Sequence, residues 1–307
     1  MRSFFRQTGY FRYSWLNLTP VGLILTLPWL VGGLCGETPS PAVPEAKWLL
    51  EKALRRLPRV EPYVLQFRQE WMHTGLTAQA QGSLMVGLAR RIHLYLRIQI
   101  SDVVGELRIY YDGQTFYRQE SVPHEATKLT RYTLADLDQA IAQANLGERE
   151  AARVREAVLA EHGFQGLRFR LTELLSRYQW GPPQSTTLPD GRAAWLLEGS
   201  WNEQTLKEAF RGQPPQAPEI ARRCRVFLLR QDTWWLGDSL WPARLEWWGL
   251  PRREKEDKLL VWLEYQTPRR LQADAPELQS PFSEQAMAQA TPADASQIIT
   301  DVLRRLR

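Results

Sequence analysis

The segment Ile92-His93-Leu94-Tyr95-Leu96-Arg97-Ile98-Gln99-Ile100 alternates strictly, with an aliphatic side chain at every second position. An extended strand points successive side chains to opposite faces, so one face here is wholly aliphatic and the other carries His, Tyr, Arg and Gln. Such alternation is typical of an antiparallel sheet that covers a core with one face and meets water with the other.

The same period of two continues on both sides of this segment. It predicts strands over about 63–71, 80–88, 106–111 and 115–120. The last two flank Asp112-Gly113, a strong signal for a hairpin turn. Together with the strand 92–100, these four strands predict a meander of antiparallel strands that share one apolar face.

The period then changes to that of helices and back again. Apolar residues at helical spacing predict helices over 45–57 and within about 133–178. A second group of strands follows the helices. They are predicted at about 177–187, 193–201, 223–231, 240–248 and 258–266.

These patterns predict an α+β protein, mainly β, with its domain over residues 45–267. About eight to ten strands in one antiparallel sheet must curl. We therefore expect an unclosed half-barrel, with helices covering the concave face and a helical insertion at about 133–178. Residues 36–44 form a Pro-rich linker before this domain, and residues 268–307 form a polar tail that ends in an amphipathic helix.

Residues 1–35 have the composition of a secretory signal peptide, because three arginines and no acidic residue precede an apolar run over 21–34. The segment 15–35 is also about long enough for an uncleaved membrane anchor. Cys35 offers an acylation site, although Leu34 departs from the lipobox pattern. The sequence therefore predicts export to the periplasm or cell envelope and leaves cleavage, anchoring and acylation open.

Composition excludes several classes of protein. Hydrophobic residues make up 44% and charged residues 24% of the chain, which is typical of a globular protein. Two cysteines, Cys35 and Cys224, are too few for a disulfide framework or a zinc ribbon. Loss of residues 1–35 removes three arginines and lowers the formal charge from +5 to +2, which argues against a nucleic-acid partner.

The chain carries no convincing catalytic or metal-binding pattern. The four histidines have no metal-ligand spacing to one another or to a cysteine. Gly237-Asp238-Ser239-Leu240 spells the signature of the GDSL esterases, but no histidine follows His162 to act as the base of a triad. We interpret this tetrapeptide as a hairpin loop and expect no enzyme activity, no cofactor and no metal.

Several short motifs resemble the outer-membrane lipoprotein carrier family (LolA/LolB-like), of which this chain looks like a diverged member. The likeness covers about 45–267, and the long helical insertion, the extra tail and the 13 tryptophans depart from the carriers. The motifs are Val64-Leu65-Gln66-Phe67-Arg68-Gln69, Gly82-Ser83-Leu84, Arg90-Arg91-Ile92, Tyr111-Asp112-Gly113-Gln114-Thr115-Phe116-Tyr117 and Trp241-Pro242-Ala243-Arg244-Leu245-Glu246.

The resemblance implies a concave apolar face, lidded by helices, that accepts acyl chains. The predicted ligand-binding residues are Leu65, Phe67, Leu84, Leu94, Leu96, Ile98, Ile109, Tyr111, Trp195, Leu197, Leu245 and Trp247. On this hypothesis the protein is a non-catalytic carrier whose partners are lipid or lipoprotein acyl chains and a membrane or envelope protein. The alternative is a closed core packed against the helices, in an envelope sensor or scaffold without a lipid ligand.

Overall fold

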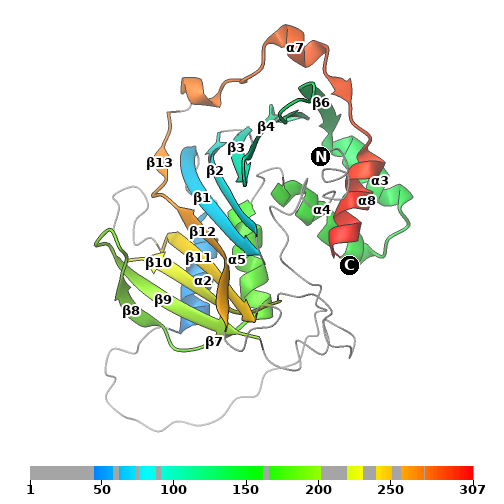
Figure 1. The fold of residues 1–307 in the computed structure, drawn as a ribbon. Coiled ribbons are helices and arrows are strands. Elements are labelled where there is room, and N and C mark those ends of the chain that lie inside the picture. Colours follow the sequence, from blue (N-terminus) through cyan, green and yellow to red (C-terminus); the bar gives the residue numbers. More distant parts are fainter. Residues whose placement is uncertain are drawn as a thin grey trace, which may run out of the picture.

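A computed structural model describes residues 45–57, 62–73, 76–87, 91–161, 166–201, 220–230, 240–250, 257–272 and 274–306 (Figure 1). The predicted signal peptide or anchor and the linker lie outside the described residues. So do Arg90, His162 and residues 237–239 of the esterase-like tetrapeptide.

The described residues contain strands and helices in the order expected, with short additions near the C-terminus. The helices are α2 (Ala46–Arg56), α3 (Leu134–Gln143), α4 (Glu148–Glu161), α5 (Gly166–Arg177), α7 (Glu284–Ala288), α8 (Ala295–Leu306) and the 3₁₀ helix η4 (Pro276–Leu278). The strands are β1 (Tyr63–His73), β2 (Leu76–Val86), β3 (Ile92–Ile100), β4 (Val103–Tyr111), β5 (Thr115–Ser121), β6 (Lys128–Thr133), β7 (Gln179–Trp180), β8 (Gln184–Thr187), β9 (Ala193–Ser200), β10 (Ile220–Leu229), β11 (Pro242–Leu250), β12 (Lys258–Tyr265), β13 (Arg269–Arg270) and β14 (Thr291–Pro292).

All described strands join one curled sheet. Its order is β14-β6-β5-β4-β3-β2-β1-β12-β11-β10-β9-β7, with β13 paired to β1 and β8 paired to β9. Neighbours are antiparallel except β14, which pairs parallel to β6. The two ends of this order do not pair with each other, so the sheet stays unclosed and the predicted mainly β, α+β half-barrel is confirmed.

The β4–β5 hairpin shows how the sequence sets a turn. Gly113 has a φ of 109°, a conformation that L-residues with a Cβ rarely adopt. The Asp112 carboxylate oxygen Oδ1 accepts hydrogen bonds from the backbone N–H groups of Gln114 at 2.8 Å and Thr115 at 2.7 Å. The Asp-Gly pair therefore fixes the register between β4 and β5.

The helices form two groups (Figure 1). Helices α2 and α5 pack against each other over the concave face of the sheet, whereas α3, α4 and α8 gather at the β6 end. Helix α3 begins directly after β6 because Thr133 and Asp136 form a capping box, in which each side chain bonds to the other's backbone N–H.

Two predicted boundaries differ from the structure. Residues 177–187 do not form one long strand, because α5 continues to Arg177 and only the short β7 and β8 follow. The segment 268–290 has little apolar periodicity, yet it makes specific contacts. Its β13 extends the pairing of β1, and Leu271 and Leu278 form a small apolar cluster with Met85 of β2.

Candidate functional site

The structure places the twelve predicted ligand-binding residues along the apolar face of the sheet. Cross-strand pairing aligns Leu65, Leu84, Leu94 and Ile109 on four consecutive strands. Nine of the twelve are buried within one hydrophobic cluster: Leu65, Leu84, Leu94, Leu96, Ile109, Tyr111, Leu197, Leu245 and Trp247. Phe67, Trp195 and Ile98 are intermediate in exposure, and the first two pack against this cluster.

Helices α2 and α5 contribute to this burial. Leu49 and Leu50 of α2 and Leu171 and Leu174 of α5 belong to the same cluster and are at most 3% exposed. Because their side chains fill the space over the sheet, this part of the concave face is a packed core. It presents no free surface to a ligand.

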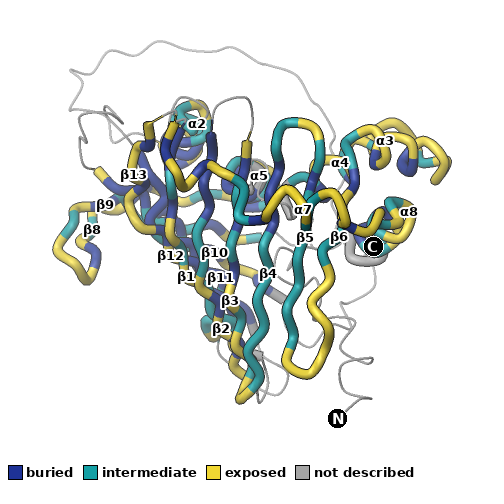
Figure 2. Tube along the Cα trace, turned by 90° about the horizontal axis from the view of Figure 1, so that it is seen from above, coloured by how far each residue is buried: buried dark blue, intermediate teal, exposed yellow. Residues whose placement is uncertain are grey.

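The concave face becomes more accessible toward the far ends of β3 and β4. Along β3, Leu94 and Leu96 are buried, whereas Ile98 and Ile100 are half-exposed, although all four share one face. Figure 2 shows the same gradient along β4, which changes from buried to intermediate. We call this region the half-exposed end. It consists of Trp71, Ile98, Ile100, Val103 and Leu107.

A continuous row of side chains links the half-exposed end to the packed core. Val261 of β12 pairs with Trp71 of β1 on one side and with Trp247 of β11 on the other. The alternation in the sequence is sufficient to place Trp71 and Ile100 on the concave face. It does not indicate that these two side chains are more exposed than the others on that face. The complete row is Cys224, Trp247, Val261, Trp71, Ala78, Ile100 and Val103.

A buried polar cluster that was not predicted from the sequence lies beside Trp247. Arg177 at the end of α5 donates from Nη2 to Glu173 Oε1 at 2.9 Å, and their side chains are only 10% and 13% exposed. Arg177 Nη1 and Glu173 Oε2 are both buried and have no hydrogen-bond partner among the described residues. Burial lowers the pKa of the Arg177 guanidinium, which Glu173 opposes.

The cluster surrounds a small cavity. Its lining consists of Arg170, Glu173, Leu174, Arg177, Tyr178 and Trp247. The cavity leaves about 10 Å³ for the centre of a water-sized group, which is near the minimum for one ordered water. A spacing of three and four residues along α5 turns Arg170, Glu173 and Arg177 toward the same side as Leu174. This spacing is the sequence signal that could have revealed the cluster.

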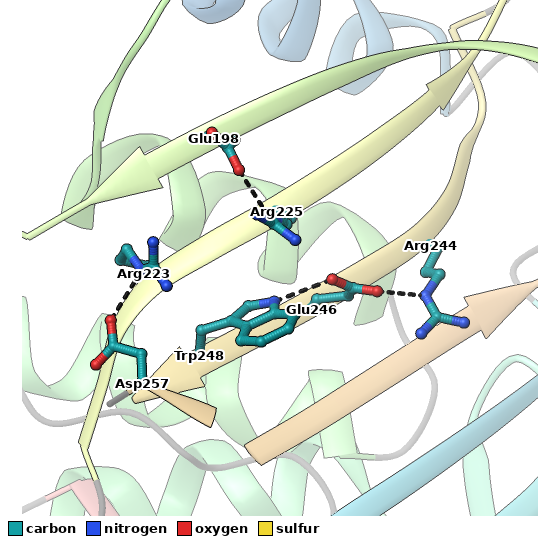
Figure 3. A network of polar contacts seen from close by, with 7 residues as sticks. All are labelled: Glu198, Arg223, Arg225, Arg244, Glu246, Trp248 and Asp257. Carbon is teal, nitrogen blue, oxygen red and sulfur yellow. Dashed lines mark hydrogen bonds and ion pairs between the residues drawn. The ribbon is translucent and has the colours of Figure 1, made fainter. Parts of the chain in front are cut away.

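The outer face of β9–β12 carries a network of charged and aromatic side chains (Figure 3). Glu246 accepts hydrogen bonds from Arg244 Nε at 2.7 Å and from Trp248 Nε1 at 3.0 Å, and its side chain is 8% exposed. Arg225 pairs with Glu198 at 2.7 Å and lies 4.9 Å from the centre of the Trp248 ring. Both Glu246 oxygens are hydrogen-bonded, so this network stabilises the sheet.

Other chemical features of the described residues are sparse. Within the described ranges, no group of three His, Cys, Asp or Glu side chains could hold a metal ion, and no helix is long and apolar enough to span a bilayer. Cys224 is a free thiol, 1% exposed, and burial raises its pKa well above the ordinary value. It packs as a small apolar residue, as its strand position predicts.

Comparison with sequences gives one short match. No family model matches the chain. A curated 4-alpha-glucanotransferase from Thermus thermophilus is 36% identical over 81 residues, which cover 24% of this chain and 16% of that protein. The chain thus spans less than a fifth of the curated relative's length.

Comparison with solved structures gives matches of low identity. LprF from Mycobacterium bovis is 10% identical, with 80% of this chain and 100% of that chain covered and a TM-score of 0.38. The Pseudomonas aeruginosa MucA/MucB complex is 14% identical, with 76% and 60% covered and a TM-score of 0.33. A putative outer membrane lipoprotein-sorting protein domain from Vibrio parahaemolyticus is 11% identical, with 72% and 91% covered and a TM-score of 0.21.

The last of these belongs to the class that the sequence motifs resemble. The strands and helices of this chain themselves define its fold. That fold defines a mainly β protein with an open, curled antiparallel sheet and helices over its concave face.

Proposed function

We propose that this protein binds acyl chains of lipids or lipoproteins on the concave face of its half-barrel, as an exported and non-catalytic carrier. The observation that supports this most is the half-exposed end. Trp71, Ile98, Ile100 and Val103 come from three different strands and form one apolar surface that α2 and α5 leave partly uncovered. An apolar surface of this kind is suited to alkyl chains.

The energetics of such binding are favourable without polar recognition. Each methylene removed from water contributes about 0.8 kcal/mol, so a chain of about 14 carbons gives roughly 10 kcal/mol before association costs. Association costs are about 4 kcal/mol or more, so about 6 kcal/mol or less remains, which corresponds to a dissociation constant of roughly tens of micromolar or weaker.

The buried part of the face favours a second candidate. Since nine of the twelve predicted residues already pack in the core, the half-barrel could act as an envelope sensor or scaffold that presents only its outer surfaces. In that case the half-exposed end is the rim of a closed core and has no lipid ligand. The two candidate functions differ in whether the purified protein carries bound lipid.

Extraction of lipid from the purified mature protein, followed by mass spectrometry, distinguishes them. We expect lipid at near-equimolar ratio and expect Ile100→Glu to abolish it. Gln99→Glu is the matched control, because Gln99 is the adjacent β3 residue on the outer face and is exposed. A wild-type protein that carries no lipid and binds no hydrophobic dye would support the sensor or scaffold instead.

Export is the part of the proposal that rests on the sequence alone. Three arginines before the apolar run over 21–34 support it. Expressed in a host with an outer membrane, the protein should mature to a form that begins near residue 36. Membrane-held protein with an intact Met1 would show an uncleaved anchor.

A further inference from the structure

The solvent side of α2 carries basic and aromatic side chains that the core does not use. The inner side of this helix is fixed, because Ala46, Leu49, Leu50 and Ala53 are at most 3% exposed and belong to the main core cluster. The opposite side of the helix is therefore held toward solvent. Figures 1 and 2 show α2 well apart from α3 and α8, so the second group of helices does not cover it.

Trp48 is the most exposed large apolar side chain among the described residues, with 45% of its surface accessible. Lys52, one turn further along α2, places its ammonium 5.0 Å from the centre of the Trp48 ring. An apolar ring and a positive charge thus lie side by side on the solvent side of one helix. This combination is typical of surfaces at a lipid–water interface, where an indole ring lies at the level of the headgroups.

The positive charge of the mature protein is concentrated at α2. The segment 45–57 carries four basic and two acidic residues, which gives it a net charge of +2. Residues 36–307 as a whole also have a net charge of +2, so the rest of the mature chain is neutral on balance. The charged residues of the segment are Glu45, Lys47, Glu51, Lys52, Arg55 and Arg56.

The helix dipole explains only part of this charge. Arg55 and Arg56 lie in the last turn of α2, where a positive charge is favourable. Lys47 lies in the first turn, where a positive charge opposes the dipole, and no acidic residue occupies that turn. Within the described part of the chain, Lys47, Lys52 and Arg55 have no carboxylate partner, and Arg55 donates to the backbone carbonyl of Glu51 at 3.3 Å. These charges are therefore available to a partner.

The position of α2 in the chain favours a membrane as that partner. Residues 36–44 link α2 to the apolar segment 15–35. Nine residues span at most about 32 Å, so an uncleaved anchor would hold α2 within reach of the bilayer surface. After cleavage, α2 is the first described helix of the mature chain. Anionic headgroups attract clustered Lys and Arg, and the same interface accepts Trp.

We propose that the basic face of α2, formed by Lys47, Trp48, Lys52 and Arg55, docks on a bilayer surface that contains anionic lipid. The inference goes beyond the acyl-binding function, because it assigns a surface that takes no part in the concave face. Since α2 lies over that face, docking turns the concave side of the sheet toward the membrane and the outer face of β9–β12 away from it (Figure 1).

The test measures co-sedimentation of the mature protein with lipid vesicles. Vesicles of phosphatidylcholine with about 30% phosphatidylglycerol are compared with vesicles of phosphatidylcholine alone. We expect binding to the anionic vesicles to be tighter by about tenfold or more. Raising the salt from about 0.1 M to about 1 M should weaken this binding, because it shortens the Debye length from about 10 Å to about 3 Å.

Two double variants remove the same charge from different places. Lys52→Gln/Arg55→Gln should weaken binding to the anionic vesicles roughly 25-fold, about fivefold for each basic residue lost. Lys128→Gln/Arg131→Gln is the matched control, since both residues are exposed on β6, away from α2, and it should bind like the wild type (Figure 1). Equal urea midpoints would confirm that both variants are folded.

Trp48 provides a second readout that reports on α2 itself. Addition of anionic vesicles should shift the tryptophan fluorescence of the wild type to shorter wavelength, because an indole that enters the interface loses contact with water. Trp48→Phe should lose most of this shift while it still binds the vesicles.

Several outcomes would overturn the inference. Equal losses in the two double variants would mean that net charge, rather than α2, decides binding. Equal binding to neutral and anionic vesicles would also contradict it, as would an unchanged fluorescence shift in Trp48→Phe. Binding to soluble polyglutamate but not to vesicles would assign the basic face to an acidic protein. None of these outcomes depends on a lipid in the concave face, so the acyl-binding proposal is tested separately.

Discussion

The ring of Phe67 on β1 lies over the backbone of Gly82, its direct partner on β2. A Cβ added at Gly82 would lie 3.0 Å from the Phe67 ring and would collide with the carbonyl oxygen of Tyr95 on β3. The glycine of the Gly-x-Leu motif is therefore required by close approach of neighbouring groups rather than by its own backbone dihedral angles.

Gly82→Ala should destabilise the domain by about 1–3 kcal/mol, because the carbonyl cannot move aside without breaking the sheet. Gly105→Ala on β4 is the control, since a Cβ there would meet only the Ser121 carbonyl oxygen at an ordinary 3.5 Å. Urea unfolding of both variants measures the difference. Equal urea midpoints for the two variants would show that the β2–β3 region accommodates the added methyl group at little cost in stability.

A glutamate at Leu96 should cost far more stability than one at Ile100. Leu96 is 6% exposed within the core cluster, so its replacement buries a carboxylate without a partner and should cost about 3 kcal/mol or more. Ile100 is half-exposed on the same face of β3, and a carboxylate there keeps part of its hydration. We expect a cost of about 1–2 kcal/mol at Ile100, measured by urea unfolding. Comparable losses of stability at both positions would mean that the side chain at position 100 is as inaccessible to water as the one at position 96.

The C-terminal helix should contribute to the stability of the whole domain. Ile299 and Val302 are at most 1% exposed and belong to the main core cluster, where α8 packs against α3 and α4. Ile299→Ala should therefore cost about 2–5 kcal/mol. Gln297→Ala, at an exposed position on the same helix, should cost much less. An unchanged melting temperature for Ile299→Ala would show that α8 is dispensable.

Stability should fall as the solution is acidified below about pH 6.5, partly because of His93. Burial lowers the pKa of His93 in the folded state, Arg108 adds to this, and a hydrogen bond with the Glu277 backbone opposes it. In the window between the folded pKa and the ordinary value of 6.5, the unfolded chain binds a proton that the folded chain does not. The stability present at neutral pH is therefore lost as the pH falls through this window.

Urea unfolding at about pH 7.5 and about pH 5.5 measures the effect. His93→Gln should reduce the loss of stability between the two conditions. His124→Gln, at an exposed turn position, should leave it unchanged. If His93→Gln and the wild type lose the same stability between the two pH values, the pH dependence is due to other groups.

The alternation of side chains predicted strands and faces well, because it depends only on neighbours along the chain. The strand 92–100 and the turn at Asp112-Gly113 are found where the sequence places them. Burial along a face is different, since it depends on which helix covers which part. Leu96 and Ile100 have the same position in the pattern, and only the tertiary packing makes Leu96 part of the core.

The buried polar cluster on α5 and the contacts of residues 268–290 were not predicted, for related reasons. Nothing in the identity of the charged residues on α5 shows that Glu173 and Arg177 neutralise each other inside the protein. Residues 268–290 contact the sheet through short pieces, such as Leu271 and Leu278, that are too brief for a period to be visible. Pairings between distant segments leave no trace in a single sequence.

The pairing of β1 with β12 joins residues nearly 200 positions apart, Phe67 with Tyr265 among them. During synthesis, β1 can pair with β2 as soon as both have emerged, but its other edge stays bare until β12 is made. Unpaired edges recruit other strands, and contacts so distant in the chain form slowly. Newly made protein therefore passes through a period in which a strand edge and an apolar face are exposed together, when folding is most vulnerable to aggregation.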